Sequence, residues 1–220
     1  NYAGTGDQQN PGNRTQVAPS GSNKVPVIYG SAYTGGIITD LSITDDNQVL
    51  YYVLTLAECT NSESTGISGT DSYTFGNVYF GGKKVVFNAT DQYKVDGLLD
   101  ESTGLTDTSV AGYLEIYLYN NGYNSQTNST QSAISVMSAA NLTYQWDSNK
   151  LMSNAAFAIV KITYNANANL TGIQQTKFQL TNSRYKPGDC FLDYLTSTRY
   201  GAAIPLTSID TATFTALNTY

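Results

Sequence analysis

Histidine is absent from the chain of 220 residues. Without histidine there is no Ser-His-Asp triad, no Cys-His dyad and no ordinary zinc or iron site. Cys59 and Cys190 lack the spacing of a thiolate metal site, and we interpret both as free, buried thiols. A Gly-rich phosphate loop is also missing, since residues 81–84 lack P-loop spacing. We therefore predict that the protein is not an enzyme and has no catalytic residues, no metal site and no cofactor.

Charge and long apolar runs are scarce as well. Charged residues make up 13% of the chain, against roughly 25% in an average soluble domain. The net charge is −6 and no Lys/Arg cluster exists, so we expect no specific binding to nucleic acid and no attraction to an anionic membrane. No apolar run approaches the roughly 20 residues that span a bilayer. Amide and hydroxyl side chains and 18 tyrosines replace the missing charge, which favours long β-sheets and protein–protein contact.

Two pairs of adjacent acids remain as candidates for chemistry, Asp45-Asp46 and Asp100-Glu101. A glycosidase needs two carboxylates across a cleft, but adjacent acids in loops are usually solvated turns. Asp40, Asp45 and Asp46 could also bind calcium, although they do not match the EF-hand loop. We favour the solvated-turn interpretation for both groups.

The chain divides into three parts by composition. Residues 1–23 have almost no large apolar side chain, which predicts a polar extended arm or linker. Residues 24–184 are rich in β-forming residues, with a change of composition near 88–110 that is compatible with two subdomains. Residues 185–220 show helical periodicity and predict two helices. The expected fold class is mainly β with a short C-terminal helical part (α+β), built from β-barrel or sandwich-like domains.

Short apolar runs bounded by turn residues mark the strands of the β-rich part. Gly81-Gly82 tolerates positive φ and predicts a hairpin turn. We expect a long loop over 88–109 and one or two helical turns over 132–137. The predicted strands are 25–29, 37–43, 49–57, 78–80, 84–87, 113–119, 156–164 and 176–180.

Tyr113, Tyr117 and Tyr119 lie on one face of the strand predicted over 113–119. Tyrosine is favoured at interfaces, so this face could bind a partner. Cross-strand packing under a loop explains the same pattern equally well. Both interpretations stay open at this point.

The helices of the C-terminal part have recognisable start signals. Pro187 suits the first helical position, and Gly201 can supply the stop of a helix whose apolar face holds Cys190, Phe191, Tyr194 and Leu195. A second helix is expected from an N-cap at Ser208, with a stripe at Ile209, Ala212, Ala216, Leu217 and Tyr220. No terminating residue follows this stripe, so we expect that the natural chain continues and that this one is truncated inside the second helix.

Residues 190–201 (CFLDYLTSTRYG), followed by Ile209-Asp210 and Phe214, resemble a segment of the tail-tip hub proteins of long-tailed bacteriophages. This family includes the lambda-type tip attachment (host specificity) proteins and is related to baseplate hub proteins. Residues 25–30 and 78–82 resemble the strand that enters the hub domains and a strand–turn element of the same family.

The resemblance implies a virion structural protein, assembled in the cytoplasm of the bacterial host. Copies of the chain would close into a ring, usually a trimer, that caps the tail tube and carries the receptor-binding region. The ring would contact the distal tail protein, the tape-measure protein and other tail proteins. Asp193, Arg199, Tyr200 and Gly201 would be architectural: Gly201 would let the backbone reverse, and Arg199 would tie the turn to carbonyl groups or to Asp193.

The alternative is a secreted β-sandwich adhesin or carbohydrate-binding module. It rests on the many tyrosine and asparagine residues and on five Asn-X-Ser/Thr sequons, at Asn13, Asn88, Asn128, Asn141 and Asn169. A ring-forming trimer on a tail tube would support the hub, whereas a monomer that binds glycans would support the adhesin.

Overall fold

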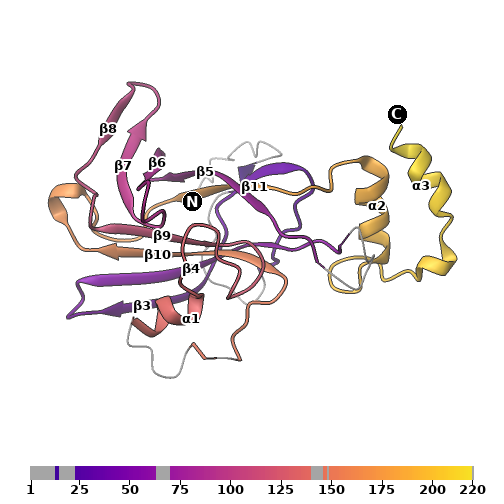
Figure 1. The fold of residues 1–220 in the computed structure, drawn as a ribbon, viewed down its shortest axis with the longest axis horizontal. Helices are drawn as coiled ribbons and strands as arrows, with labels where there is room; N and C mark the ends of the chain where they lie inside the picture. Colours follow the sequence, from indigo (N-terminus) through magenta and orange to yellow (C-terminus); the bar gives the residue numbers. More distant parts are fainter. Residues whose placement is uncertain (1–12, 15–22, 63–69, 140–145, 148, 220) are drawn as a thin grey trace, which may run out of the picture.

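The computed structural model describes residues 13–14, 23–62, 70–139, 146–147 and 149–219. The predicted arm lies mostly outside the described residues, and Asn13–Arg14 forms the two-residue strand β1. None of the helices in this described part is long and apolar enough to cross a membrane. The fold is mainly β with a few short helices, as the sequence predicts, and its strands form two sheets (Figure 1).

The smaller sheet contains four antiparallel strands in the order β3-β4-β10-β9. Its two inner strands are buried along almost their whole length, which confirms them as central strands. An irregularity in the β3–β4 register at Thr39 reverses the faces of β3, so that Ser42 is buried while Leu41 and Ile43 are exposed. The four strands are β3 (Ile37–Thr44), β4 (Val49–Glu58), β10 (Ala155–Thr163) and β9 (Leu114–Tyr119).

The larger sheet contains seven strands in the order β1-β2-β11-β5-β6-β7-β8. Its pairs are antiparallel apart from the parallel pair of β1 and β2. Gly81 and Gly82 form the turn between β5 and β6 with φ values of 57° and 81°, as predicted. The remaining strands are β2 (Ser31–Thr34), β11 (Thr176–Thr181), β5 (Thr74–Phe80), β6 (Lys83–Phe87), β7 (Val95–Asp100) and β8 (Leu105–Asp107).

Two expectations for this part of the chain are wrong. The loop predicted over 88–109 contains the hairpin of β7 and β8, whose short ladder and exposed Leu105 gave little periodic signal. The strand predicted over 25–29 is reduced to an isolated bridge between Val27 and Glu58. Here Ile28 bonds instead to the Tyr73 hydroxyl, which donates to the Ile28 carbonyl and accepts from the Ile28 N–H.

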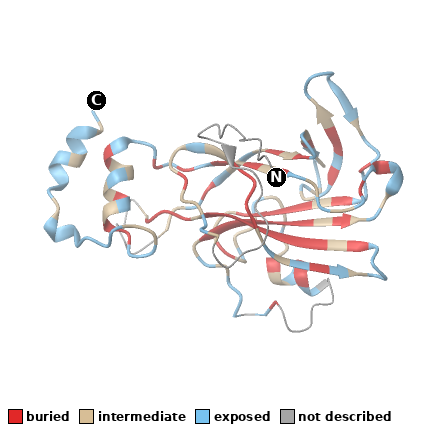
Figure 2. Cartoon of the chain, turned by 180° about the vertical axis from the view of Figure 1, so that it is seen from behind, coloured by how far each residue is buried: buried red, intermediate tan, exposed pale blue. Residues whose placement is uncertain are grey.

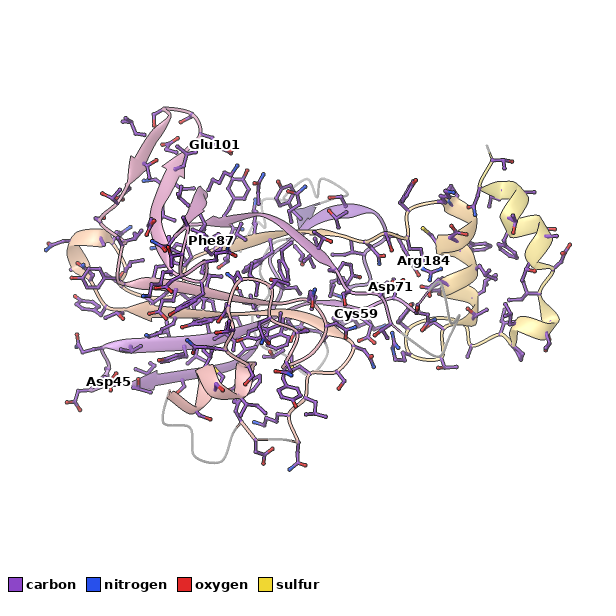
Figure 3. All side chains as sticks on the ribbon, in the orientation of Figure 1. Asp45, Cys59, Asp71, Phe87, Glu101 and Arg184 are labelled. Carbon is purple, nitrogen blue, oxygen red and sulfur yellow. The ribbon has the colours of Figure 1, made fainter. Side chains whose placement is uncertain are left out.

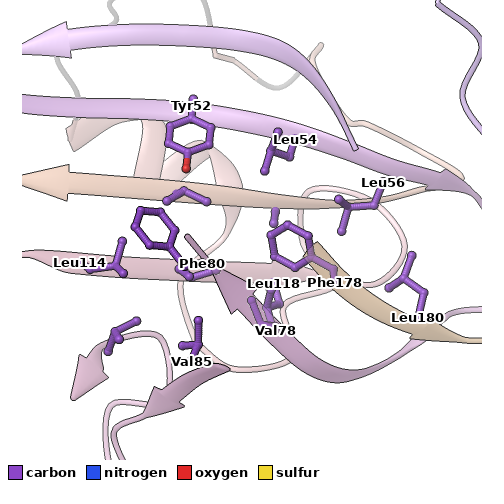
Figure 4. Close-up of a cluster of buried hydrophobic side chains, with 14 of the residues drawn as sticks. Tyr52, Leu54, Leu56, Val78, Phe80, Val85, Leu114, Leu118, Phe178 and Leu180 are labelled. Atoms are coloured by element: carbon purple, nitrogen blue, oxygen red, sulfur yellow. The ribbon is translucent and has the colours of Figure 1, made fainter. Parts of the chain in front are cut away.

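The two sheets pack face to face and form a β-sandwich. Side chains from both inner faces interdigitate, and the largest fully buried ones include Tyr52, Phe80 and Phe178 (Figure 4). Val95 and Leu98 of β7 belong to the same cluster, so the segment near 88–110 contributes to this core. The core is therefore built from apolar side chains on the facing sides of the two sheets, as in other β-sandwiches.

A second apolar cluster covers the outer face of the four-stranded sheet. Helix α1 (Ala133–Ala139), expected from the sequence as one or two turns, places Val136 and Met137 against Phe157 and Ile159. Trp146 closes the cluster, and its indole N–H donates to Asp40 Oδ2 at 2.6 Å. The small sheet is thus covered on both faces, which explains why β4 and β10 are apolar on both sides.

Two helices project from one end of the sandwich (Figure 1). They are α2 (Pro187–Thr196), with Pro187 at its start as predicted, and α3 (Thr211–Leu217). The N-cap of α3 is Asp210 and not Ser208, which lies in the 3-10 turn η2 (Leu206–Ser208). The helix ends at Leu217 with Asn218 as its C-cap, earlier than expected, and Tyr220 lies outside the described residues. A second 3-10 turn, η1 (Ala166–Ala168), follows β10.

Candidate functional site: the junction of sandwich and helices

Asp193 lies at the centre of the junction between the sandwich and α2. It is 3% exposed, and its carboxylate accepts hydrogen bonds from the Tyr29 hydroxyl at 2.7 Å and the Tyr200 hydroxyl at 2.6 Å. It also accepts from the Asn61 N–H at 3.2 Å. The structure therefore brings together Asp193 and Tyr200, two of the motif residues, and joins them to two segments of the sandwich.

The two tyrosines are held as neutral donors. Burial, followed by the hydrogen bond and charge of Asp193, raises the pKa of the Tyr29 hydroxyl well above its ordinary value. The same causes in the same order raise the pKa of Tyr200. Both hydroxyl groups are therefore protonated at neutral pH and compensate the cost of burying the carboxylate.

Arg184 is a second buried charge at this junction and was missed in the sequence analysis. Its Nη2 donates to the Asn61 carbonyl at 2.5 Å and forms an ion pair with Asp71 at 3.4 Å (Figure 3). Nearby, the Asn182 side chain donates to Thr60 Oγ1 at 2.8 Å. The available signal was an arginine between the last strand and Pro187 in a chain with few cations.

Arg199 binds the sandwich from the end of α2. Its Nε lies 2.7 Å from Glu58 Oε1, and its Nη2 donates to the Cys59 carbonyl. The predicted bond to a carbonyl is confirmed, whereas the described carboxylate partner of Arg199 is Glu58 and not Asp193. Arg199 thus adds an anchor that is separate from the Asp193 network.

Gly201 is required by a close approach of two backbone segments. A Cβ at this position would lie 1.8 Å from the Tyr194 carbonyl oxygen, which the Ala202 N–H reaches at 2.9 Å. The expected helix stop at Gly201 is wrong, because α2 ends at Thr196 with Ser197 as its C-cap. Gly188 plays a similar part between the helices, since its Cβ would lie 2.0 Å from the Phe214 carbonyl oxygen.

The helical pair exposes much of its apolar surface (Figure 2). The predicted apolar face of α2 is not buried as a unit, because the residues it buries are Gly188, Asp193 and Thr196. None of the residues of α3 is buried. The helical-pair surface, as we call it, comprises the exposed apolar side chains of Tyr185, Phe191, Tyr194, Ile204, Leu206 and Leu217.

The three tyrosines of the predicted strand 113–119 divide between core and surface, and Tyr113 lies just before β9. Tyr117 and Tyr119 are buried, which corrects the interface interpretation in favour of packing. Tyr117 stacks on Tyr93 with ring centroids 4.7 Å apart, and Tyr119 stacks on Phe157 at 4.6 Å. Tyr113 is 39% exposed and remains available at the surface.

The acid pairs lie in separate, exposed turns. Asp45 and Asp46 occupy the β3–β4 turn with positive φ, while Asp100 and Glu101 lie at the tip of the β7–β8 hairpin (Figure 3). Bonds from the Ser102 hydroxyl and N–H lower the pKa of Asp100. Among the described residues, no group of three or more His, Cys, Asp or Glu side chains could hold a metal ion.

The two cysteines are free, as expected. Cys59 is buried, and burial raises the pKa of its thiol to about 12. Cys190 on α2 is only half-buried, and burial is also the main cause that raises the pKa of its thiol. Neither thiol is prepared for nucleophilic chemistry, which needs a lowered pKa.

The fold and this junction define a β-sandwich with a tightly anchored helical pair. No family model matches the chain. No curated protein matches it either.

Proposed function

We propose that the chain is a structural component of a bacteriophage tail tip, part of the central hub ring that closes the tail tube and carries the receptor-binding region. The observation that carries the proposal is the helical-pair surface, because the family-like segment 190–201 contributes Phe191 and Tyr194 to it and anchors the helices to the sandwich. In this proposal the protein is not an enzyme, and its place is the virion.

The anchoring of the helices supports an architectural role for the motif. Asp193 and Tyr200 accept from the Asn61 N–H. Arg199 pairs with Glu58, and Gly201 permits the close turn that follows them. Burial of the Asp193 carboxylate costs free energy unless hydrogen-bond donors satisfy it. The requirement for these donors fixes the orientation of the helices on the sandwich better than apolar contact would. Such an orientation is what a subunit needs when it repeats around a ring.

The composition of the helical-pair surface supports a protein partner. Its exposed side chains are tyrosine, phenylalanine, leucine and isoleucine, and aromatic residues are enriched at protein interfaces. Phe191 and Phe214 lie with ring centroids 5.8 Å apart, so the apolar surface extends from α2 to α3. An apolar surface that remains uncovered in one chain is explained when other subunits cover it.

The proposed partners are further copies of the chain, in a trimeric ring, and then the distal tail and tape-measure proteins. Strand β3 offers a second contact, because it is an edge of its sheet with Leu41 and Ile43 exposed. The opposite edge, β9, is already occupied, since Tyr93 and Asn128 bond to its backbone. The two edges of the small sheet therefore differ in their readiness to pair with another subunit.

The test compares two tyrosines that are both 49% exposed, Tyr194 on the helical pair and Tyr164 on the sandwich. Light scattering over a concentration series should show a trimer for the wild-type chain. Tyr194→Ser should raise the concentration needed for assembly at least tenfold, whereas Tyr164→Ser should leave it unchanged. Immunogold imaging of particles that carry the chain should place it at the tail tip. A monomer at every concentration, or label elsewhere on the particle, would overturn the proposal.

A further inference from the structure

A hollow of about 450 Å³ is lined by residues from both sheets and from the segments that join them. Its walls come from β5, from the turn that follows β6, and from the segment that follows β9. The volume falls within the range of about 300–1,000 Å³ that is typical of ligand sites. None of the described side chains that line it is charged.

Three polar side chains in this hollow have no hydrogen-bond partner in the described part of the chain. Thr74, Gln92 and Asn120 line it, and no hydrogen bond within the described residues involves their side chains. An amide group offers both donors and an acceptor, and a hydroxyl group offers one donor and an acceptor. The hollow therefore presents mixed, uncharged hydrogen-bonding groups to a ligand.

Two phenyl rings supply apolar contact beside these polar groups. Phe75 and Phe87 are half-buried at the border of the sandwich core and also line the hollow. Phe75 packs edge-to-face against the buried Phe178 with centroids 6.5 Å apart, which fixes the orientation of its ring. Phe87 is the last residue of β6, and Figure 3 labels it.

The walls of the hollow are held by two asparagines whose side chains are fully used. Asn128 accepts from the Leu118 N–H at 3.0 Å and donates to the carbonyls of Gln92 and Ile116 at 3.0 and 2.9 Å. Asn88 donates to Asp96 and accepts from two backbone N–H groups. Both are sequon residues, and these bonds occupy the amide nitrogen that glycosylation would modify.

We infer that this hollow is a binding site for a neutral carbohydrate. Sugar hydroxyl groups donate and accept, as amides and hydroxyls do, and the C–H faces of a sugar ring can pack against phenyl rings. Lys and Arg do not occur among the described lining residues, which disfavours phosphate and other anions. The inference goes beyond the proposed assembly role and does not depend on it.

The test measures binding of lactose, maltotriose and N,N′-diacetylchitobiose to the full chain, by saturation-transfer NMR and then calorimetry. At least one neutral sugar should bind, and inorganic phosphate should not. The double variant Gln92→Ala/Asn120→Ala should weaken binding at least tenfold without loss of folding, because neither side chain forms a hydrogen bond to another described residue. The matched control is Asn124→Ala, an exposed asparagine that lines a different hollow.

The outcomes separate the two proposals. Failure of all three sugars to bind, binding of phosphate alone, or unchanged binding by the double variant would each overturn the carbohydrate site. A chain that binds sugar but never assembles would support this site and contradict the proposed function. A chain that assembles but binds no sugar would do the reverse.

Discussion

The sandwich and the helical pair are stabilised by different kinds of contact. The sandwich buries large apolar side chains from both sheets, among them Phe80 and Phe178. The helical pair leaves most of its apolar side chains exposed and is held by hydrogen bonds, ion pairs and close glycine contacts. One region is therefore stabilised by burial and the other by specific geometry.

This difference implies that the two regions have different roles: the sandwich stabilises the chain, and the junction fixes the position of the helices. A hydrophobic core tolerates small shifts, whereas a buried carboxylate with three donors fixes one arrangement. Loss of apolar burial should lower the stability of the whole chain, while loss of a junction contact should release the helices first. The following variants test that contrast in order of expected effect.

The largest effect is expected from Phe178→Ala. Phe178 is 0% exposed in the sandwich core, and truncation of such a residue costs about 3–5 kcal/mol of unfolding free energy. The matched control is Phe191→Ala on α2, where the ring is 53% exposed and the change should stay within about 0.5 kcal/mol. Urea unfolding followed by the fluorescence of Trp146, which lies in the sandwich, measures both. Equal losses of unfolding free energy in the two variants would contradict the proposed difference between the sandwich and the helical pair.

A smaller and more local effect is expected from Gly201→Ala. The added Cβ would meet the Tyr194 carbonyl oxygen at 1.8 Å, so the turn must shift, at a cost of about 1–3 kcal/mol. Hydrogen exchange should accelerate in α2 and α3 while the strands of the sandwich keep their protection. Gly172→Ala is the control, because nothing lies within 4 Å of its added Cβ and its φ is not in the positive range. Unchanged exchange in the helices would show that the turn adapts without cost.

Periodicity in the sequence was sufficient to find most of the sandwich. The alternation in β9 and the double-sided apolar runs of β4 and β10 predict strands that the structure contains. Periodicity failed where the ladder is short, as in β7 and β8, and it does not reveal the inserted residue that changes the faces of β3 at Thr39. A register break depends on the partner strand, which local sequence does not reveal.

The junction could be predicted only in part. The motif drew attention to Asp193, Arg199, Tyr200 and Gly201, and the structure places them together at the junction. Their partners Tyr29 and Glu58 lie more than 100 residues away in the chain, so no local pattern could connect them. For the same reason, Arg184 and its partner Asp71 were not recognised.

The smallest effect at neutral pH is expected from Tyr200→Phe, which removes one of the donors to Asp193. Asp193 keeps the Tyr29 hydroxyl and the Asn61 N–H, so the loss should be about 1 kcal/mol at pH 7. Tyr113→Phe is the control, because no hydrogen bond within the described residues involves the Tyr113 side chain, and its stability should not change.

The same variant should change the alkaline limit of stability. Folding raises the pKa of Tyr200 above its ordinary value of 10.0, so the native state keeps a proton that the unfolded chain loses above about pH 10. The contribution of Tyr200 is therefore complete below that pH and declines as the pH rises. The decline is at most about 1.4 kcal/mol per pH unit, and less where solvent screens the half-buried hydroxyl. Urea unfolding at pH 7, 10 and 11 should give a shallower alkaline loss for Tyr200→Phe than for wild type. Parallel losses would mean that Tyr200 ionises in the folded chain as readily as in the unfolded one, and that the junction is open in solution.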